Sequence, residues 1–328
     1  MASTTLRIAV VQFAPKIGQV HANIAKAREL CKQIIPRSVD LVCLPEMIFT
    51  GYVFSNMASI SPYLEHPHTG PTSRFCAELA QSLHCYVTAG YPERVESHDA
   101  TISADRDGET LFGANSAVMY DHSGQLVTSN PIRKTNLFET DIPWAIPGTG
   151  FTTLSLPQPI GLMTLAICND LNVQKPAVWS SLETGPYELA QHCIDKGTRL
   201  LVLLNAWLHH DQADKGGNES EQDEGKITDS SEPDRETLNY WALRLRPLWA
   251  AVEEARAEAE TTAEAERIPE ELIVVVSNRF GFENGKTFAG SSALYSLRRG
   301  SGRPRLLHAM GQREEGVSVW SVGKGAHS

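Results

Sequence analysis

Short apolar segments of strand length recur along this chain, and they constrain its fold more than any other feature. Residues 6–13, 39–44 and 85–91 read as buried strands, while 21–35 and 72–83 show the spacing of apolar residues expected of helices. Strands that alternate with helices along a sequence are typical of α/β proteins with parallel strands. The early part of the chain therefore predicts a sheet flanked by helices.

The later segments favour antiparallel pairing. Residues 114–120 and 125–130 flank the turn at 121–124, which predicts a β-hairpin. Further strand-like segments lie at 161–167, 199–204, 271–278, 291–296 and 317–322, with a helix near 187–196. Alternation early in the chain and hairpins later predict an α/β sandwich with a mixed sheet.

The acidity of the chain is confined to two segments. Residues 211–236 carry −7 and residues 251–271 carry −6, a total of −13, so the rest of the chain carries +3 of the net −10. The first segment is rich in Gly, Ser, Asp and Glu and poor in apolar residues, which predicts a mobile loop. Residues 237–268 read as one long helix, kinked at Pro247.

The sequence disfavours several classes of protein. No run or stripe of Lys and Arg indicates nucleic-acid binding, and the longest apolar runs are too short to cross a bilayer. The six cysteines show no CxxC pair or metal-ligand spacing, so we expect reduced thiols and no metal. The N-terminus lacks the basic start and long apolar run of a secretory signal. We therefore expect a cytoplasmic protein without a membrane or nucleic-acid partner.

Glu46, Lys134 and Cys168 each lie at or just past the end of an apolar, strand-like run. In an α/β sheet, such positions deliver side chains into the crevice at the carboxyl ends of the strands. A cysteine attacks an acyl carbon as a thiolate and needs a base, and the oxyanion that forms needs a fixed positive charge. Glutamate can supply the base and lysine the charge, so the three residues together predict acyl-transfer chemistry.

Each of the three residues also has a structural interpretation. Glu46 fits a helix N-cap or an ion-pair partner as well as a base whose pKa is raised by burial. Lys134 fits a solvated loop lysine, and Cys168 fits a core cysteine because an apolar run precedes it. Asn169 and Asp170 then interrupt that run with polar groups, as expected for a nucleophile on a tight turn.

In this order and setting, the three residues resemble the Glu-Lys-Cys triad of the nitrilase (carbon-nitrogen hydrolase) superfamily. The turn at 50–52 after the glutamate, Leu137 three residues after the lysine, and the late segment 277–292 match the pattern of that superfamily. The resemblance runs from residue 6 to about residue 322, interrupted by the acidic segment. It implies an α/β fold, a four-layer α-β-β-α sandwich, in one domain spanning 1–328 with the insert at 211–236.

The resemblance also implies a mechanism. Glu46 would take the proton of Cys168, and the thiolate would attack a carboxamide to form a thioester. Lys134 and the backbone N–H of Asn169 would hold the oxyanion. No metal or organic cofactor is needed, and members of the superfamily commonly form homodimers.

Three local segments, 133–141, 168–172 and 205–208, resemble the fungal-type N-terminal amidase branch of this superfamily. That branch converts the N-terminal Asn and Gln of proteins or peptides into Asp and Glu with release of ammonia. In the branch, the product feeds arginylation and ubiquitin-dependent degradation. A peptide N-terminus presents an ammonium beside the side-chain amide, and a buried cation requires an anion.

The resemblance therefore suggests substrate-binding residues near the triad. The candidates are Asp170, Glu139, Asp141, Asn205 and Trp207. The carboxylates among them are candidates for the ammonium, with a structural ion pair or cap as the alternative for each. Glu139 is also the only glutamate between Lys134 and Cys168, so it is the candidate for the second catalytic glutamate that many members carry.

Two alternatives to this function stay open at the level of sequence. The first keeps the chemistry and changes the substrate, giving a small-molecule amidase, an N-carbamoyl hydrolase or a nitrilase. The second is a catalytically silent member used as a binding scaffold, against which the intact triad argues. Ammonia release from peptides that begin with Asn, Gln and acetyl-Asn separates these interpretations.

Overall fold

The computed structural model describes residues 5–95, 113–178, 180–181, 184–209, 231–251 and 270–323. The predicted insert at 211–236 lies outside these ranges except for its last six residues, 231–236. Residues 252–268 of the predicted long helix lie outside them as well. Among the residues that are described, no helix is long and apolar enough to cross a membrane.

The first of two six-stranded sheets contains both the first and the last described strand of the chain. Its order in space is β14 (Gly316–Val322), β1 (Leu6–Gln12), β2 (Leu41–Cys43), β3 (Tyr86–Arg94), β4 (Gly113–Tyr120) and β5 (Ile132–Arg133). The strands β1, β2 and β3 are parallel to one another. The outer strands β14, β4 and β5 pair antiparallel with their neighbours, so the sheet is mixed.

The second sheet repeats this plan. Its order is β13 (Arg305–Ala309), β12 (Ala293–Arg298), β9 (Glu271–Asn278), β8 (Leu200–Asn205), β7 (Leu162–Ile167) and β6 (Thr152–Ser155). The strands β7, β8 and β9 are parallel, and the others pair antiparallel. A separate two-stranded ribbon joins β10 (Phe280–Glu283) to β11 (Lys286–Ala289).

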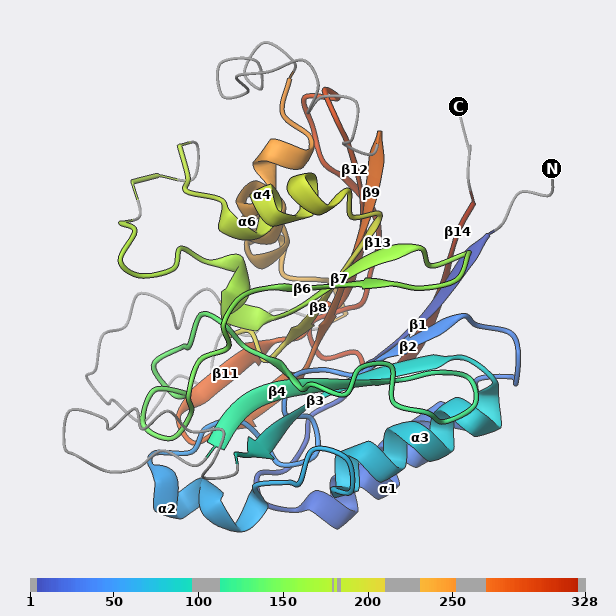
Figure 1. Ribbon diagram of the computed structural model, residues 1–328, viewed down its shortest axis with the longest axis vertical. Helices are drawn as coiled ribbons and strands as arrows, with labels where there is room; N and C mark the ends of the chain where they lie inside the picture. The colour runs from blue at the N-terminus through green and yellow to red at the C-terminus, as the bar shows by residue number, and fades with distance from the viewer. Residues whose placement is uncertain are drawn as a thin grey trace.

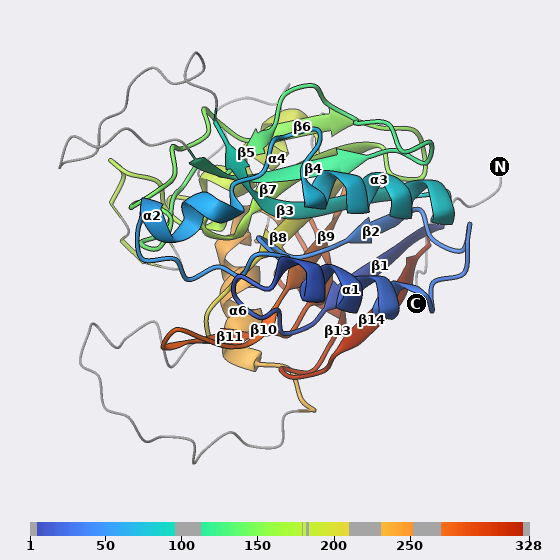
Figure 2. The ribbon, with the colours of Figure 1, turned by 90° about the horizontal axis from the view of Figure 1, so that it is seen from below.

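Helices cover the outer faces of both sheets, which gives four layers (Figure 1). Helices α1 (Val20–Cys31) and α3 (Pro71–Leu83) pack on the first sheet, as Figure 2 shows from below. Helices α4 (Glu188–Lys196) and α6 (Arg235–Arg244) pack on the second. The short helical elements are α2 (Met57–Ile60), η1 (Ser61–Tyr63), η2 (Cys168–Leu171) and η3 (Arg246–Leu248). The predicted four-layer α-β-β-α sandwich is confirmed.

The apolar core explains why the central strands read as continuous hydrophobic runs. One cluster lies between the sheets and includes Ile8 of β1 and Val202 of β8. Two others lie between each sheet and its helices, and they include Val42 of β2 and Leu203 of β8. All six residues of β8 are buried. Parallel strands that are covered on both faces need apolar side chains on both, so alternation disappears from the sequence.

Two predictions about local structure need correction, the second of them only at residues 231–236. The predicted long helix ends at Arg244, and the chain continues through the 3-10 turn η3, because Pro247 has no N–H to extend an α-helix. Asp234, which lies in the predicted mobile insert, is buried and accepts hydrogen bonds from the N–H groups of Glu236 and Thr237, at 3.1 and 3.3 Å. The last residues of that segment therefore cap α6.

The hairpin prediction is correct only near its turn. The segment 125–130 makes one bridge, between Tyr120 and Leu126, and β4 forms its ladder with β5 instead.

Candidate active site

The three predicted catalytic residues lie at the ends of strands from both sheets. Glu46 follows β2, Lys134 directly follows β5, and Cys168 directly follows β7. The side chains of Glu46 and Lys134 are fully buried, and Cys168 is 6% exposed. The two sheets face each other at this point, so the structure brings together three residues that are far apart in the sequence.

Lys134 is the centre of a buried charged cluster. Its Nζ lies 2.8 Å from Oε1 of Glu46 and 2.7 Å from Oδ2 of Asp141. Asn115 donates from Nδ2 to both carboxylates, at 2.7 Å to Glu46 and 2.9 Å to Asp141. The hydroxyl of Tyr52 accepts from Lys134 at 3.3 Å and donates to Asp141 at 3.2 Å. Each charged group in this cluster therefore has a partner, as a dry interior requires.

The cluster changes the acidity of its members. Burial raises the pKa of Glu46, while the charge of Lys134 opposes this and that of Asp141 adds to it. Burial alone would lower the pKa of Lys134, but the negative charges of Asp141 and Glu46 outweigh burial and raise it well above its ordinary value. The lysine therefore stays protonated, and Glu46 holds a proton more firmly than an exposed carboxylate does. These are the properties of an oxyanion donor and a general base.

Cys168 is held as a neutral thiol in the resting site. Burial first, and the negative charge of Glu46 second, raise the pKa of its thiol well above the ordinary value, against the opposing effects of Lys134 and the Ala206 N–H. Ala206 also donates its N–H to Oε2 of Glu46 at 2.7 Å. The thiol needs a base when substrate arrives, and Glu46 is the carboxylate that hydrogen-bonds to it.

The candidate nucleophile, Cys168, lies on a strained turn. Cys168 has φ 45°, in the left-handed region that a residue with a side chain enters at a cost of about 1–3 kcal/mol. The 3-10 turn η2 begins at this residue. Asn169 is its second residue, and the first N–H groups of a helical turn have no acceptor within that turn. This is the position from which the predicted backbone donor to the oxyanion would act.

Asp170 holds this turn against the lysine loop. Its Oδ2 accepts from the N–H of Ile167 at 2.9 Å, and its Oδ1 accepts from the N–H groups of Thr135 and Asn136, both at 2.8 Å. Burial raises its pKa to about 6, and these N–H groups oppose the shift. Three backbone donors occupy the carboxylate. These contacts support the structural alternative for Asp170, which joins the turn of Cys168 to the loop of Lys134, and its part in receiving a substrate ammonium stays a prediction.

Asn136 strengthens the same connection from the other side. Its Nδ2 donates to the carbonyl oxygens of Asn169, Asn172 and Val173, at 2.9, 3.2 and 3.1 Å. Asn169 returns two hydrogen bonds from its own Nδ2 to the carbonyls of Asn136 and Leu137, both at 3.2 Å. The loop that carries the lysine and the loop that carries the cysteine are thus joined along their length. The sequence reasoning missed Asn136.

Gly90 of β3 allows Glu46 to reach its place. A Cβ built on this glycine would lie 2.5 Å from Cα of Glu46 and 2.8 Å from the nitrogen of Met47. Both are backbone atoms, which cannot rotate away as the end of a side chain can. Only a residue without a side chain lets the backbone of the glutamate pack this closely against β3.

Glu139 does not enter the site. Its side chain is 62% exposed and pairs with Nζ of Lys286 at 2.8 Å, which is wrong for a second catalytic glutamate or an ammonium ligand. Asp141, two residues further on, occupies the buried position beside Lys134 and also accepts from the N–H of Phe138 at 2.9 Å. Glu139 was the candidate from the sequence because it is a glutamate, whereas the carboxylate that the structure places beside Lys134 belongs to Asp141.

Arg133 points away from its neighbour in sequence. Its guanidinium makes two hydrogen bonds to Glu93, at 2.9 and 2.5 Å. Successive residues of a strand point to opposite faces, so only one of the two cations can reach the triad. That cation is Lys134.

Asn205 and Trp207 flank Ala206 at the end of β8. The side chain of Asn205 is fully buried, and within the described residues both atoms of its amide lack a hydrogen-bond partner. The N–H of Trp207 donates to Oδ1 of Asn278 at 2.8 Å, and its ring packs against that of Tyr240 with centroids 5.6 Å apart. Both residues border the site, and their part in substrate binding stays a prediction.

Three further residues of the site were not identified from the sequence. Asn115, Tyr52 and Ala206 all contact the charged cluster. Asn115 gave one signal, because it is a polar amide in a strand whose eight residues are all buried. Ala206 gave none, because it acts through its backbone. In the described part of the chain, no group of three or more His, Cys, Asp or Glu side chains is arranged to hold a metal ion.

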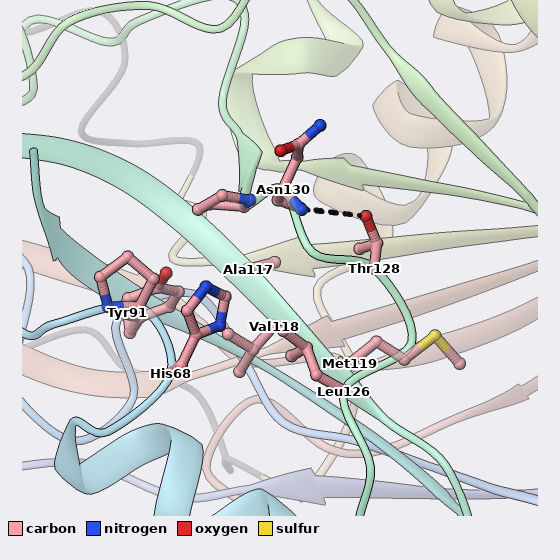
Figure 3. Close-up of a pocket in the computed structure, with 10 residues that line it drawn as sticks. His68, Tyr91, Ala117, Val118, Met119, Leu126, Thr128 and Asn130 are labelled. Carbon is pink, nitrogen blue, oxygen red and sulfur yellow. Dashed lines mark hydrogen bonds between the residues drawn. The ribbon is translucent and has the colours of Figure 1, made fainter. Parts of the chain in front are cut away.

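A small cavity lies on the first sheet, apart from the triad. Figure 3 shows it between β3, β4 and the segment after β4. Its lining residues are Pro67, His68, Tyr91, Ala117, Val118, Met119, Leu126, Thr128, Asn130 and Pro131. Its volume of about 10 Å³ has room for roughly one water molecule. None of the three catalytic candidates lines it.

Comparison with known proteins identifies the family of this chain. Residues 7–186 match the carbon-nitrogen hydrolase family model. This chain therefore belongs to the carbon-nitrogen hydrolase family.

Within this family, the chain is similar to several individual proteins. The chain is 31% identical over 330 residues to the protein N-terminal amidase of Schizosaccharomyces pombe, covering 97% of this chain and 100% of the relative. It is 25% identical over 226 residues to that of Saccharomyces cerevisiae, covering 62% of this chain and 45% of the relative. A crystal structure of N-terminal amidase with an Asn-Glu-Ala peptide superposes with a TM-score of 0.75 at 20% identity, covering 98% of both chains.

Proposed function

We propose that this chain hydrolyses the side-chain carboxamide of an N-terminal Asn or Gln in peptides and proteins, releasing ammonia and leaving Asp or Glu. The observation that carries the chemistry is the placement of Cys168 beside Glu46, with Lys134 2.8 Å from the same carboxylate. The substrate class rests on the relatives. Two of these are named protein N-terminal amidase, and similar structures contain peptides that begin with Asn or Gln.

The proposed reaction has two halves. Glu46 takes the thiol proton as the sulfur attacks the carboxamide carbon, and Lys134 with the Asn169 N–H stabilises the oxyanion. The tetrahedral intermediate collapses when ammonia leaves with the proton from Glu46, which gives a thioester on Cys168. Water, deprotonated by Glu46, then attacks the thioester and releases the new carboxylate. The raised pKa of Glu46 suits a group that both takes and returns a proton.

The charge of the site supports a cationic substrate. Two carboxylates, those of Glu46 and Asp141, surround the one ammonium of Lys134, so acidic groups outnumber basic groups in the cluster. Low-dielectric surroundings strengthen the field of these groups. A carboxamide that arrives next to an α-ammonium would therefore be favoured over a neutral amide. The field of the cluster supports this preference without assigning one carboxylate to the ammonium.

Acetylation of the substrate tests this assignment. Peptides that begin with Asn should be hydrolysed, and their acetylated forms should lose roughly two orders of magnitude or more in kcat/KM, because acetylation removes the cation that the acidic cluster attracts. Ammonia release and a mass gain of about one dalton report the reaction, with Cys168→Ala as the blank. Equal rates on free and acetylated peptides would favour a small-molecule amidase, an N-carbamoyl hydrolase or a nitrilase.

The remaining expectations from the sequence are part of the same proposal. We expect one domain with the acidic insert at 211–236, of which residues 211–230 lie outside the described ranges, together with a homodimer and a cytoplasmic location. Light scattering of the purified protein tests the dimer. Replacement of the insert by a short Gly/Ser linker tests the domain, since an unchanged melting temperature is expected if the segment packs on nothing.

A further inference from the structure

A second buried ion pair lies behind Tyr52, outside the charged cluster. The guanidinium of Arg279 lies 2.6 Å from Oε2 of Glu283, and the two side chains are 0% and 2% exposed. The same guanidinium lies over the ring of Phe288, 3.9 Å from its centroid. A buried ion pair rarely stabilises a fold more than apolar side chains of the same volume would. Stability alone therefore does not explain this pair.

Glu283 connects the pair to the backbone of Tyr52. Its Oε1 accepts from the N–H groups of Tyr52 and Val53, at 2.6 and 2.5 Å. Gly51 lies beside the same carboxylate with φ 84°, and a Cβ there would lie 2.9 Å from Oε2 of Glu283 and 2.8 Å from Cα of Ile17. The backbone around Tyr52 is thus fitted closely to one carboxylate from a distant part of the chain.

The other end of Tyr52 reaches the triad. Its hydroxyl contacts both Lys134 and Asp141, and Nζ of Lys134 lies 5.4 Å from the centre of its ring. Phe288 packs edge-to-face on the ring, with centroids 6.2 Å apart. Glu283 therefore fixes the backbone of Tyr52, and Phe288, on which Arg279 lies, fixes its ring.

We propose that Arg279 and Glu283 are positioning residues that hold the hydroxyl of Tyr52 against Lys134 and so direct the ammonium of that lysine toward the oxyanion. The proposal rests on the role given to Lys134 in the proposed function. The pair acts through Tyr52 and Phe288 on a group that is already charged and buried. Loss of the Arg279–Glu283 pair should therefore lower kcat and leave KM nearly unchanged.

Glu283→Gln tests the proposal, because it keeps the length of the side chain and removes its charge. We expect kcat to fall on the order of 10-fold, less than the loss of an entire oxyanion donor. Tyr52→Phe should cause a similar loss. If Glu283 acts through Tyr52, the double variant is no slower than the slower single variant, since the two changes remove one interaction. Fully additive losses, or full activity in Glu283→Gln, would overturn the proposal.

A matched control and a second variant keep the result interpretable. Glu315→Gln removes a carboxylate from an exposed ion pair with Lys26 and should leave kcat unchanged. If Glu283→Gln fails to fold because Arg279 is left unpaired, the double variant Arg279→Met/Glu283→Gln removes both charges and leaves neither uncompensated. It should show the same loss of kcat. A folded double variant with full activity would contradict the proposal.

A readout without substrate separates this proposal from the proposed function. The charge of Lys134 lowers the pKa of the Cys168 thiol, so a displaced lysine should raise it further. Alkylation of Cys168 by iodoacetamide, followed against pH, should shift to higher pH in Glu283→Gln and stay unchanged in Glu315→Gln. If the pH dependence of Cys168 alkylation is the same in Glu283→Gln as in wild type, the positioning role of Arg279 and Glu283 is wrong. This holds even if the wild-type protein hydrolyses no Asn-peptide.

Discussion

The two sheets have the same plan, three parallel central strands between antiparallel outer strands, but they contribute different things to the site. The first supplies charged and polar side chains, Glu46, Asn115 and Lys134, which hold one another. The second supplies the candidate nucleophile Cys168 and the N–H of Ala206, and carboxylates hold this backbone, because Ile167 donates its N–H to Asp170 and Ala206 donates its N–H to Glu46. Charges in a dry interior need partners, whereas a nucleophile on a strained turn needs a fixed backbone.

Because the two sheets contribute different things, substitutions on each sheet should have different kinds of effect. Changes to the cluster on the first sheet should alter electrostatics, so their effects should depend on pH. Changes to the turn on the second sheet should alter geometry, so their effects should be the same for every substrate. The predictions below test this division, beginning with the largest effect.

Cys168→Ala should abolish turnover, with a loss of more than roughly 10⁴-fold in kcat. Its melting temperature should change little, because a small side chain is removed and the hydrogen bonds of Asp170 remain. Ammonia release and a thermal scan measure the two effects. Residual turnover, with an acyl adduct found by mass spectrometry on Cys193 or Cys43, would show that the nucleophile is elsewhere.

Lys134→Met should lose at least the roughly 10²–10³-fold typical of one oxyanion donor. It should also destabilise the fold by about 3–5 kcal/mol, since a buried ion pair loses one partner. The pKa of Glu46, already raised by burial, rises further without the opposing charge of Lys134. A folded pKa above the unfolded value means that stability falls as pH rises.

The melting temperature of Lys134→Met should therefore be furthest below that of wild type at pH 8 and closer to it at pH 5. Thermal scans over this range measure the difference. If the melting temperature of Lys134→Met lies below that of wild type by the same amount at every pH, Glu46 is not electrostatically coupled to the lysine.

Asp170→Asn should reduce kcat on the order of 10-fold, because an amide offers only one acceptor oxygen where the carboxylate offers two. The loss should be equal for free and acetylated Asn-peptides, since the substitution acts on the turn. The rate of Cys168 alkylation should change in the same variant. A loss confined to the free peptide would instead identify Asp170 as the ammonium ligand and undo the division between the sheets.

Glu65→Gln should have no effect on activity and should change only the pH dependence of stability. Glu65 accepts from the N–H and the hydroxyl of Thr72, both at 2.8 Å, and burial raises its pKa to about 7. Its folded pKa lies above the unfolded value of about 4.5, so wild type loses stability as pH rises between these values. Glu65→Gln lacks this loss of stability. The difference between its melting temperature and that of wild type should therefore shift in favour of the variant as pH rises from 5 to 8.

The sequence predicted what depends on local pattern. Strands buried on both faces stand out as apolar runs, and a polar residue at the end of such a run is visible, which is how Glu46 and Cys168 were found. The strands β6, β10 and β13 were missed because they are short and partly exposed, so their pattern is weak.

Which carboxylate side chains are buried in the site, and which groups they contact, could not be predicted from local pattern. Asp141 and Glu139 are two residues apart, and only the position of Lys134, fixed by pairing with β4, decides which of them is buried. Asp170 has the sequence neighbours expected of a binding residue, but its three partners include two N–H groups 34 and 35 residues away. Contacts between distant parts of the chain carry that information, and local periodicity does not.

Because β14 pairs antiparallel with β1, the first sheet cannot fold completely until the end of the chain has been synthesised. The pairing runs from Leu6↔Val322 to Gln12↔Gly316 (Figure 1). On a ribosome, β1 emerges first, and every candidate catalytic residue emerges before β14. Until β14 arrives, β1 presents an unpaired edge of backbone N–H and C=O groups, the kind of surface that recruits strands from other chains. Truncation before Gly316 would make that transient edge permanent, so we expect such a chain to aggregate although its triad is intact.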